Sequence, residues 1–152
     1  MYWKGAVVSD QFRSGDVERR LENLLRIGTV HSVDYGAARI RVETGDLVTD
    51  WIPWLTTRAG PDVTWWAPEI GEQVMVLAPG GVLEDAVAIG AAFQDAHPAP
   101  AASENVHISR YRDGTEIRYD RSAHALSVNC VGDVTFSCAG KFTVTASTIH
   151  LN

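Results

Sequence analysis

The chain has 152 residues, a formal net charge of −6, 45% hydrophobic residues and five tryptophans, a composition typical of a packed globular protein and not of a disordered one. No apolar run reaches the roughly 18 residues that a membrane-spanning helix requires, which excludes such a helix. Basic residues are few and interleaved with acids, so we do not expect nucleic acid to be the main partner.

Residues 1–26 are expected to form an N-terminal extension and a short amphipathic helix. Ser14-Gly15-Asp16 is typical of a helix start, because acidic residues stabilise the N-terminal turn. One apolar stripe follows at positions i, i+4, i+7 and i+8, formed by Val17, Leu21, Leu24 and Leu25. Gly28 is expected to end the helix. A helix this short needs a surface to lie on, either its own domain or a partner protein.

Residues 27–92 are expected to form a small β-barrel of five strands. The predicted strands start at Ile27, Ala38, Leu47, Gln73 and Ala86. Between residues 38 and 43, apolar and charged residues alternate as in a half-buried strand. Pro53 lacks an N–H group and therefore predicts an edge position or a bulge. Five short strands with glycine-rich connections fit an OB-type barrel, and they fit other small barrels nearly as well.

Four tryptophans belong to this predicted barrel: Trp51, Trp54, Trp65 and Trp66. Such side chains can stack on bases or sugars, as they do in some OB barrels. The basic groove that would accompany nucleic-acid stacking is missing. We therefore favour the interpretation that these tryptophans close the barrel and contribute to subunit contacts.

Residues 93–104 are rich in proline and alanine and are expected to be a semi-rigid linker. From residue 105 to residue 152 a pair of apolar residues, separated by one residue, recurs with turn residues between the pairs. The pairs are Val106/Ile108, Ile117/Tyr119, Leu126/Val128, Val134/Phe136, Phe142/Val144 and Ile149/Leu151. This period indicates stacked short strands whose apolar residues all point to one side. Each strand has too few inward side chains for a core of its own, so several copies are expected to share one axis in a β-prism or β-helix.

No motif for catalysis or metal binding stands out. The five histidines are scattered, and their positions are His31, His97, His107, His124 and His150. His107 and His150 lie between residues expected to point inward, which predicts that they point outward. Cys130 and Cys138 have no spacing typical of a zinc site. No carboxylate pair or activated nucleophile is evident, so we expect a protein that is not an enzyme and has no metal or cofactor.

The ordered set of motifs in the chain is specific. It comprises LRIGTV at 25–30, ARIRV at 38–42, TDWIPWL at 49–55, RAG at 58–60, WAPEIGEQV at 66–74, PGG at 79–81 and RYRDGT at 110–115. Over residues 17–145 this set resembles the baseplate assembly protein V family, the central tail spike of contractile-tailed phages and R-type pyocins.

The resemblance implies an all-β homotrimer with an OB-fold collar behind a short leading helix, followed by a triple-stranded β-helix. It implies a structural function, in which sheath contraction drives the spike through the outer membrane of the target cell. The location would be the tail baseplate of a virion or pyocin particle assembled in the bacterial cytoplasm. The partners would be two further copies, the baseplate hub and the tail tube proteins. The twelve residues of the apolar pairs would form the trimer core. Contacts of the collar or hub are assigned to Trp51, Trp54, Trp65, Trp66, Leu21 and Leu25.

The family often ends in a tapered apex, where an HxH motif from three chains binds iron. This sequence stops within the repeat at His150-Leu151-Asn152. We therefore expect that the chain is truncated or that a separate tip protein caps it, and an apex iron site would lie beyond residue 152. Two other interpretations stay open. One is an OB module that binds glycan or nucleic acid and carries a trimerising stalk, and the other is a polysaccharide-degrading tail fibre.

Overall fold

The structure is a computed structural model that describes residues 6–150, with side chains described from Ser14 onward. It comprises two compact units, residues 1–99 and residues 100–152. Among the described residues, no helix has both the length and the apolar character needed to cross a membrane.

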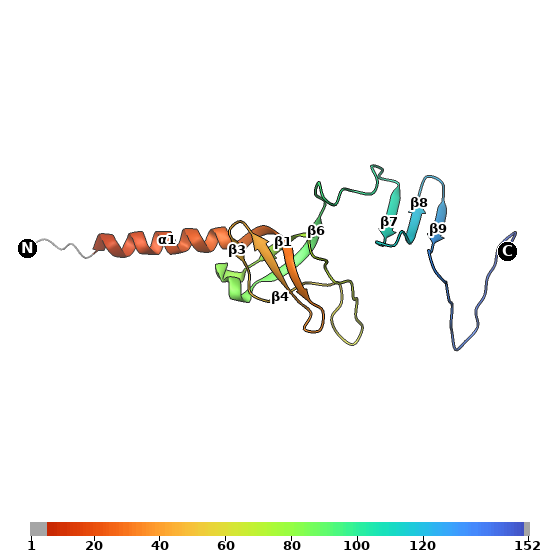
Figure 1. Cartoon of the computed structure of the whole chain (residues 1–152), viewed down its shortest axis with the longest axis horizontal. Coiled ribbons are helices and arrows are strands. Elements are labelled where there is room, and N and C mark those ends of the chain that lie inside the picture. Colours follow the sequence, from red (N-terminus) through yellow and green to blue (C-terminus); the bar gives the residue numbers. More distant parts are fainter. Residues whose placement is uncertain (1–5, 151–152) are drawn as a thin grey trace, which may run out of the picture. The chain divides into compact units, whose positions relative to one another are not determined.

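Helix α1 spans Ala6–Leu24 and continues directly into strand β1 (Figure 1). The prediction that the helix starts near Ser14 is wrong, because the helix begins at Ala6 and passes through Gly15. Asp16 accepts hydrogen bonds from Arg19 (2.7 Å) and Arg20 (2.9 Å), one helical turn away. Asp16 therefore belongs to an intrahelical ion-pair cluster and does not mark the helix start.

The sequence predicted that Gly28 ends the helix, and this is wrong. Gly28 lies within β1 (Leu25–Asp34). A Cβ atom at this position would collide with the carbonyl oxygen of Glu43 in the neighbouring strand. Glycine at residue 28 therefore permits the close approach of two strands.

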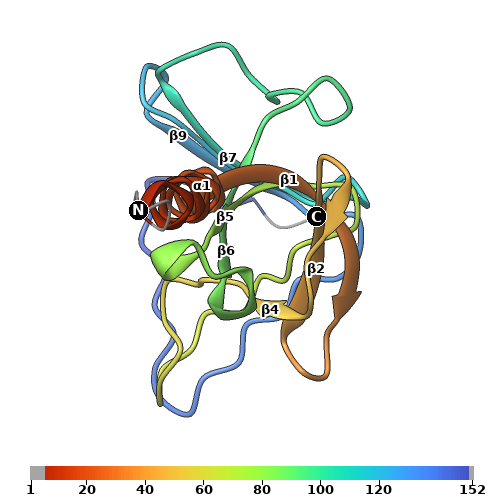
Figure 2. The same cartoon turned by 90° about the vertical axis from the view of Figure 1, so that its left-hand side faces the viewer.

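The barrel comprises β1, β2 (Arg39–Thr44), β3 (Leu47–Val48), β4 (Ile52–Pro53), β5 (Gln73–Leu77) and β6 (Val87–Ala92). The antiparallel order is β3-β2-β1-β5-β6, and β4 also pairs with β2. Trp54, directly after β4, bridges in parallel to Ala88 of β6. This bridge closes the ring of strands that surrounds the barrel interior in Figure 2.

The single strand predicted to start at Leu47 is divided into β3 and β4. Thr49 lies between them and is buried, and its hydroxyl accepts a hydrogen bond from the amide of Val42 at 3.0 Å. Because this side chain replaces a backbone partner in the ladder, regular pairing stops there. Pro53 lies in the short strand that follows the interruption.

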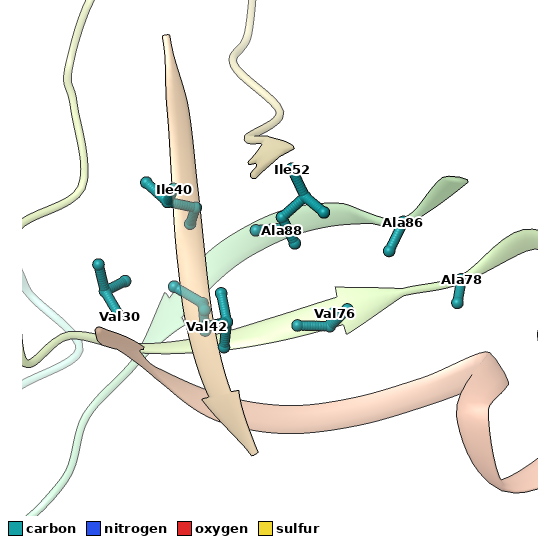
Figure 3. Close-up of a cluster of buried hydrophobic side chains, with 9 residues drawn as sticks. Val30, Ile40, Val42, Ile52, Val76, Ala78, Ala86 and Ala88 are labelled. Carbon is teal, nitrogen blue, oxygen red and sulfur yellow. The ribbon is translucent and has the colours of Figure 1, made fainter. Parts of the chain in front are cut away.

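Small aliphatic side chains from all sides of the barrel form its core. They are Val30, Ile40, Val42, Ile52, Val74, Val76, Ala78, Ala86 and Ala88. Figure 3 shows Ile40 and Val42 of β2 directed at Val76 and Ala88 of the opposite strands. The prediction of alternation in residues 38–43 is confirmed, since Ile40 and Val42 are buried and Glu43 is exposed.

The C-terminal end of α1 is anchored to the barrel through backbone and side-chain contacts. The amide of Ala78 donates to the carbonyl of Leu24 at 3.0 Å. Asn23 is buried and accepts a hydrogen bond from Arg26 at 2.8 Å, and Arg26 also donates to Thr44. Two short 3-10 turns, η1 (Pro79–Gly81) and η2 (Leu83–Asp85), connect β5 to β6. Gly81 packs directly against the backbone of Arg20 in the helix.

The second unit contains a three-stranded antiparallel sheet of β7 (Val106–Arg110), β8 (Glu116–Asp120) and β9 (Ala125–Asn129) (Figure 1). The turn between β7 and β8 contains Gly114 at φ +94° and a hydrogen bond from the Tyr111 amide to the Thr115 carbonyl. The carboxylate of Asp120 accepts from the amides of Ser122 and Ala123 and so orders the turn before β9.

Residues 130–150 contain neither helix nor strand, and every residue in this range is exposed. The strands predicted around Val134, Phe142 and Ile149 are therefore absent from the single chain, and Leu151 lies outside the described residues. A strand forms only when a second strand satisfies its backbone N–H and C=O groups. Nothing in the described part of this chain supplies such a partner.

Candidate subunit-contact surfaces

The sheet of the second unit has two chemically different faces. Residues opposite each other in an antiparallel pair lie on the same face. The register pairs Ile117 with Val128 and Tyr119 with Leu126, so these four residues share one face. All four are exposed in the single chain. We call this set the apolar sheet face.

The other face carries Val106 and Ile108, which are paired with Asp120 and Arg118. The prediction that all the apolar pairs point to one side is therefore wrong for Val106 and Ile108. His107 was expected to point away from the inward residues, and this is also wrong, since it is paired with Tyr119 on the apolar sheet face.

The length of the turn between β7 and β8 explains why Val106 and Ile108 lie on the face opposite the apolar sheet face. Arg110 is paired with Glu116, so the turn holds the five residues 111–115, and even-numbered residues of β7 face even-numbered residues of β8. The second turn holds the four residues 121–124, which pairs odd-numbered with even-numbered residues. Because side chains alternate along a strand, one residue more or less in a turn reverses the face.

The face opposite the apolar sheet face is charged. Arg110 pairs with Glu116 at 2.7 Å, and Arg118 pairs with Asp120 at 3.5 Å. Hydrogen bonds, first of all from the Ser122 hydroxyl, lower the pKa of Asp120 and keep it charged. A surface of partly exposed ion pairs suits contact with water.

The segment after β9 continues the apolar character without any internal cover. Its large exposed side chains are Val131, Val134, Phe136, Phe142, Val144 and Ile149. The rings of Phe136 and Phe142 stack with their centroids 5.7 Å apart. The structure brings Phe136 and Phe142 of this set together. The assignment of the set to a trimer core stays a prediction.

In the barrel unit, the structure brings the rings of Trp54 and Trp65 together. Trp54 is half-buried against the core, and its ring meets that of Trp65 edge to face at 5.4 Å. Trp51 is exposed beside β2, where its carbonyl accepts from Arg39 at 3.0 Å. Trp66 is 60% exposed.

A groove of about 260 Å³ runs beside this cluster and is lined by Trp54, Leu55, Trp66, Pro68, Glu72, Val74, Ala88, Ile89, Gly90 and Ala91. Burial raises the pKa of Glu72, and the nearby His97 opposes that rise. The amide side chain of Gln94 donates to the carbonyl of Gly71 at 2.7 Å, so residues 94–97 are attached to the same side of the barrel.

The apolar stripe of α1 is not covered by its own domain. Val17 is 54% exposed and Leu21 is 60% exposed, and Ser14 to Glu22 are all exposed. Leu25 belongs to β1 and is also exposed. The sequence left open whether the helix lies on its own domain or on a partner protein. For Val17 and Leu21 the structure rules out the chain's own domain.

Sequence reasoning missed a row of apolar side chains on the outside of the barrel, formed by Ile27, Met75 and Ile89. The alternation of residues 25–29 contains the signal, because Leu25 and Ile27 lie at odd positions while the core residue Val30 is even.

Cys130 and Cys138 are exposed free thiols, each donating to a nearby carbonyl, and no cluster of three metal-ligating side chains occurs among residues 6–150.

Two comparisons with known proteins agree with the fold. Residues 26–93 match the family described as the type VI secretion system/phage-baseplate injector OB domain. The spike protein of Escherichia phage P2 is 37% identical over 134 residues, which is 88% of this chain. The chain spans 64% of the length of that relative. The prediction of an OB-type barrel is confirmed by the family match.

Proposed function

Since the chain belongs to the phage-baseplate spike family and carries the injector OB domain at residues 26–93, we propose that it acts as the homotrimeric central spike of a contractile tail. In this proposal the barrel is the collar at the baseplate hub and tail tube, and the second unit is the rod. Sheath contraction drives the rod through the outer membrane of the target cell. The protein acts within a phage or pyocin particle, and a separate tip protein is a further candidate partner.

The observation that carries the proposal is that residues 115–150 of the single chain have apolar side chains without cover and, from residue 130 onward, backbone groups without strand partners. The apolar sheet face is exposed, and residues 130–150 have neither strand partners nor a cover for their apolar side chains. Further copies of the same chain provide both, because each copy offers matching strands and matching apolar residues. Three short sheets that pool their apolar faces around one axis form a closed prism without free edges.

The register refines the predicted trimer core. We assign Ile117, Tyr119, Leu126 and Val128 to the axis, followed along the chain by the apolar residues of 131–149. Val106 and Ile108 lie with the ion pairs on the opposite face, and we place them on the outside of the rod. Each apolar side chain buried at the axis contributes about 1.5–3 kcal/mol, so the contributions of three chains make the rod hard to unfold under load.

Light scattering of the whole chain in solution tests the trimer. Three chains of 16.6 kDa each give a mass of about 50 kDa. Val128→Asp should prevent assembly, because it would bury three like charges at one level of the axis. Ser127→Asp is the matched control on the opposite face and should leave the mass unchanged. A compact 16.6 kDa monomer for the unsubstituted chain would overturn the spike proposal.

The mechanical function is tested with contractile particles that lack their own spike. Particles complemented with the unsubstituted chain or with Ser127→Asp should assemble and permeabilise target cells, and those with Val128→Asp should not. Equal activity of all three would contradict a piercing function that depends on the rod.

The groove beside Trp54 and Trp66 favours one alternative, an OB module that binds a glycan or an oligonucleotide and uses the rod as a stalk. Titration of the trimer with bacterial surface oligosaccharides and with single-stranded DNA distinguishes the two. Saturable quenching of tryptophan fluorescence that Trp66→Ala abolishes would support the binding module.

A further inference from the structure

Cys130 and Cys138 occupy the same position of a short internal repeat. Residues 126–133 read LSVNCVGD and residues 134–141 read VTFSCAGK. In both stretches apolar residues stand at the first and third positions, cysteine at the fifth and glycine at the seventh. A pattern that recurs with a fixed period indicates that one local structure is built twice. The two thiols therefore have equivalent places in the proposed rod.

The end of β9 places Cys130 on the apolar sheet face. The strand ends at Asn129, and Val128 before it lies on that face. Just beyond the strand, the amide of Val131 donates to the hydroxyl of Thr115 at 3.3 Å, so the chain continues beside the start of β8. Because side chains alternate along an extended chain, Cys130 follows Val128 on the same face.

Within one chain neither thiol has the partners that a metal ion needs. The Sγ atom of Cys130 donates to the carbonyl of Asp133 at 3.6 Å, and that of Cys138 donates to the carbonyl of Gly140 at 3.2 Å. Each thiol is thus held in its own turn. No group of three metal-ligating side chains occurs in the part of the chain that the structure describes, residues 6–150. A site at either cysteine is therefore incomplete without further copies of the chain.

Three-fold symmetry supplies the missing ligands. In the proposed trimer Val128 and Phe136 face the shared axis, and a cysteine stands two residues after each of them, on the same side of the chain. A rotation axis repeats every residue at the same level. The axis is therefore surrounded by three thiols at the level of Cys130 and by three more at the level of Cys138.

Three converging thiols are a ligand set for a soft metal ion. Thiolate sulfur selects ions such as Zn²⁺ and Cu⁺, whereas Mg²⁺ and Ca²⁺ take oxygen ligands. Binding releases the thiol protons, and a zinc–sulfur bond is about 2.3 Å long. An ion held by one sulfur atom of each chain links the three chains at that level. Because it binds only the assembled form, it stabilises the trimer by mass action.

We propose that Cys130 and Cys138 form two metal sites on the axis of the trimer, each of which binds one soft metal ion through the thiolates of three chains. This inference rests on the proposed trimeric spike. The two sites follow each other along the rod, one in each repeat, and the apolar axis residues Val134 and Phe136 lie between them in sequence.

Titration of the full chain with cadmium alone tests the proposal, in oxygen-free buffer and after reduction of the thiols. Cd²⁺ is a soft ion without redox chemistry, and its bonds to thiolate absorb in the ultraviolet. The unsubstituted trimer should bind two ions. Cys130→Ser and Cys138→Ser should each bind one ion per trimer, and the double variant should bind none. The mass of every variant is measured first.

Ser137→Cys in the Cys130→Ser, Cys138→Ser background is the matched control. It carries the same number of thiols as the Cys130→Ser variant, and its thiol stands next to residue 138 in the sequence. Because neighbouring side chains point to opposite sides of an extended chain, this thiol faces away from the axis. The control trimer should show no saturable binding of cadmium.

Three results would overturn the inference while leaving the trimeric rod intact. The first is binding of three ions per trimer, since Cys130 and Cys138 of one chain would then share an ion. The second is a trimer that binds no cadmium. The third is equal binding by the Ser137→Cys control and the Cys130→Ser variant. A monomeric unsubstituted chain would instead contradict the proposed function itself, so the two failures are distinguishable.

Discussion

Two neighbouring glycines show how one residue holds the helix to the barrel. Gly80 and Gly81 both have positive φ, at +63° and +71°. A Cβ atom on Gly80 would meet nothing within 4 Å, whereas one on Gly81 would collide with the backbone of Arg20. Both glycines are required for the backbone conformation of the turn, but only Gly81 is also required for the packing of α1.

Gly81→Ala should therefore destabilise the protein more than Gly80→Ala. Left-handed backbone alone costs about 1 kcal/mol at either position, and the collision adds on the order of 1–3 kcal/mol at Gly81. Denaturant unfolding followed by tryptophan fluorescence measures the difference, because Trp51, Trp54, Trp65 and Trp66 lie in the barrel unit. Equal losses of stability would show that α1 is not anchored at this contact.

Glu72 gives a prediction on pH dependence. Burial raises the pKa of its carboxyl group above the usual glutamate range, with His97 opposing the rise. The folded state therefore binds the proton more tightly than the unfolded state. Stability should decrease as the pH rises from the ordinary glutamate range through the raised value.

Replacing the Glu72 carboxyl group by an amide should remove this loss of stability at higher pH. Glu72→Gln should have a higher melting temperature than the unsubstituted chain at about pH 7, and the difference should vanish at about pH 4. Glu84→Gln, at an exposed position of the same unit, is the control and should show no such pH dependence. A Glu72→Gln variant less stable at neutral pH would mean that the charge is favourable where it lies.

At the scale of elements, the two turns of the second unit decide which residues lie together. Ile117 lies on the apolar sheet face, whereas Ile108 lies beside Arg118 on the charged face. Ile117→Asp should prevent trimer formation. Ile108→Asp should be tolerated, because the new carboxylate faces an arginine across the strands. Sedimentation or light scattering of both variants measures this, and loss of the trimer in both would place β7 inside the core.

The same elements show what the sequence could predict. The alternation at residues 38–43 was sufficient for β2, since a half-buried strand needs only a period of two. The face of β7 was not predictable from apolar residues alone, because it depends on the number of residues in the 111–115 turn. The start of α1 was missed because Asp16 resembles an N-terminal acidic residue while its partners are Arg19 and Arg20.

At the scale of the whole molecule, the two units have different sources of stability. The barrel has its own buried core within one chain, whereas the described part of the second unit has a sheet with exposed faces and a segment without partners. The repeat of apolar pairs predicted that other chains are needed, but it did not show the apolar row of Ile27, Met75 and Ile89 on the outside of the barrel. That row consists of residues from three strands that only the folded register brings together.

The melting temperature of the full chain should therefore depend on its concentration. Raising the concentration of a protein that folds by association stabilises the folded form by mass action. Far-UV circular dichroism at concentrations about a hundredfold apart should show an increase for the unsubstituted chain, and none for Val128→Asp. A concentration-independent transition for both would indicate that the second unit folds within one chain.

The lack of backbone partners in residues 130–150 also affects the order in which the parts of the chain fold. During synthesis the barrel segment is made before residues 130–150 and has all that it needs to fold, whereas in the proposed trimer residues 130–150 wait for other chains. Until these arrive, its valines and phenylalanines are open to any hydrophobic surface. The yield of spike should thus be set by competition between assembly and aggregation, and crowding of newly made copies at one place in the cell would favour assembly.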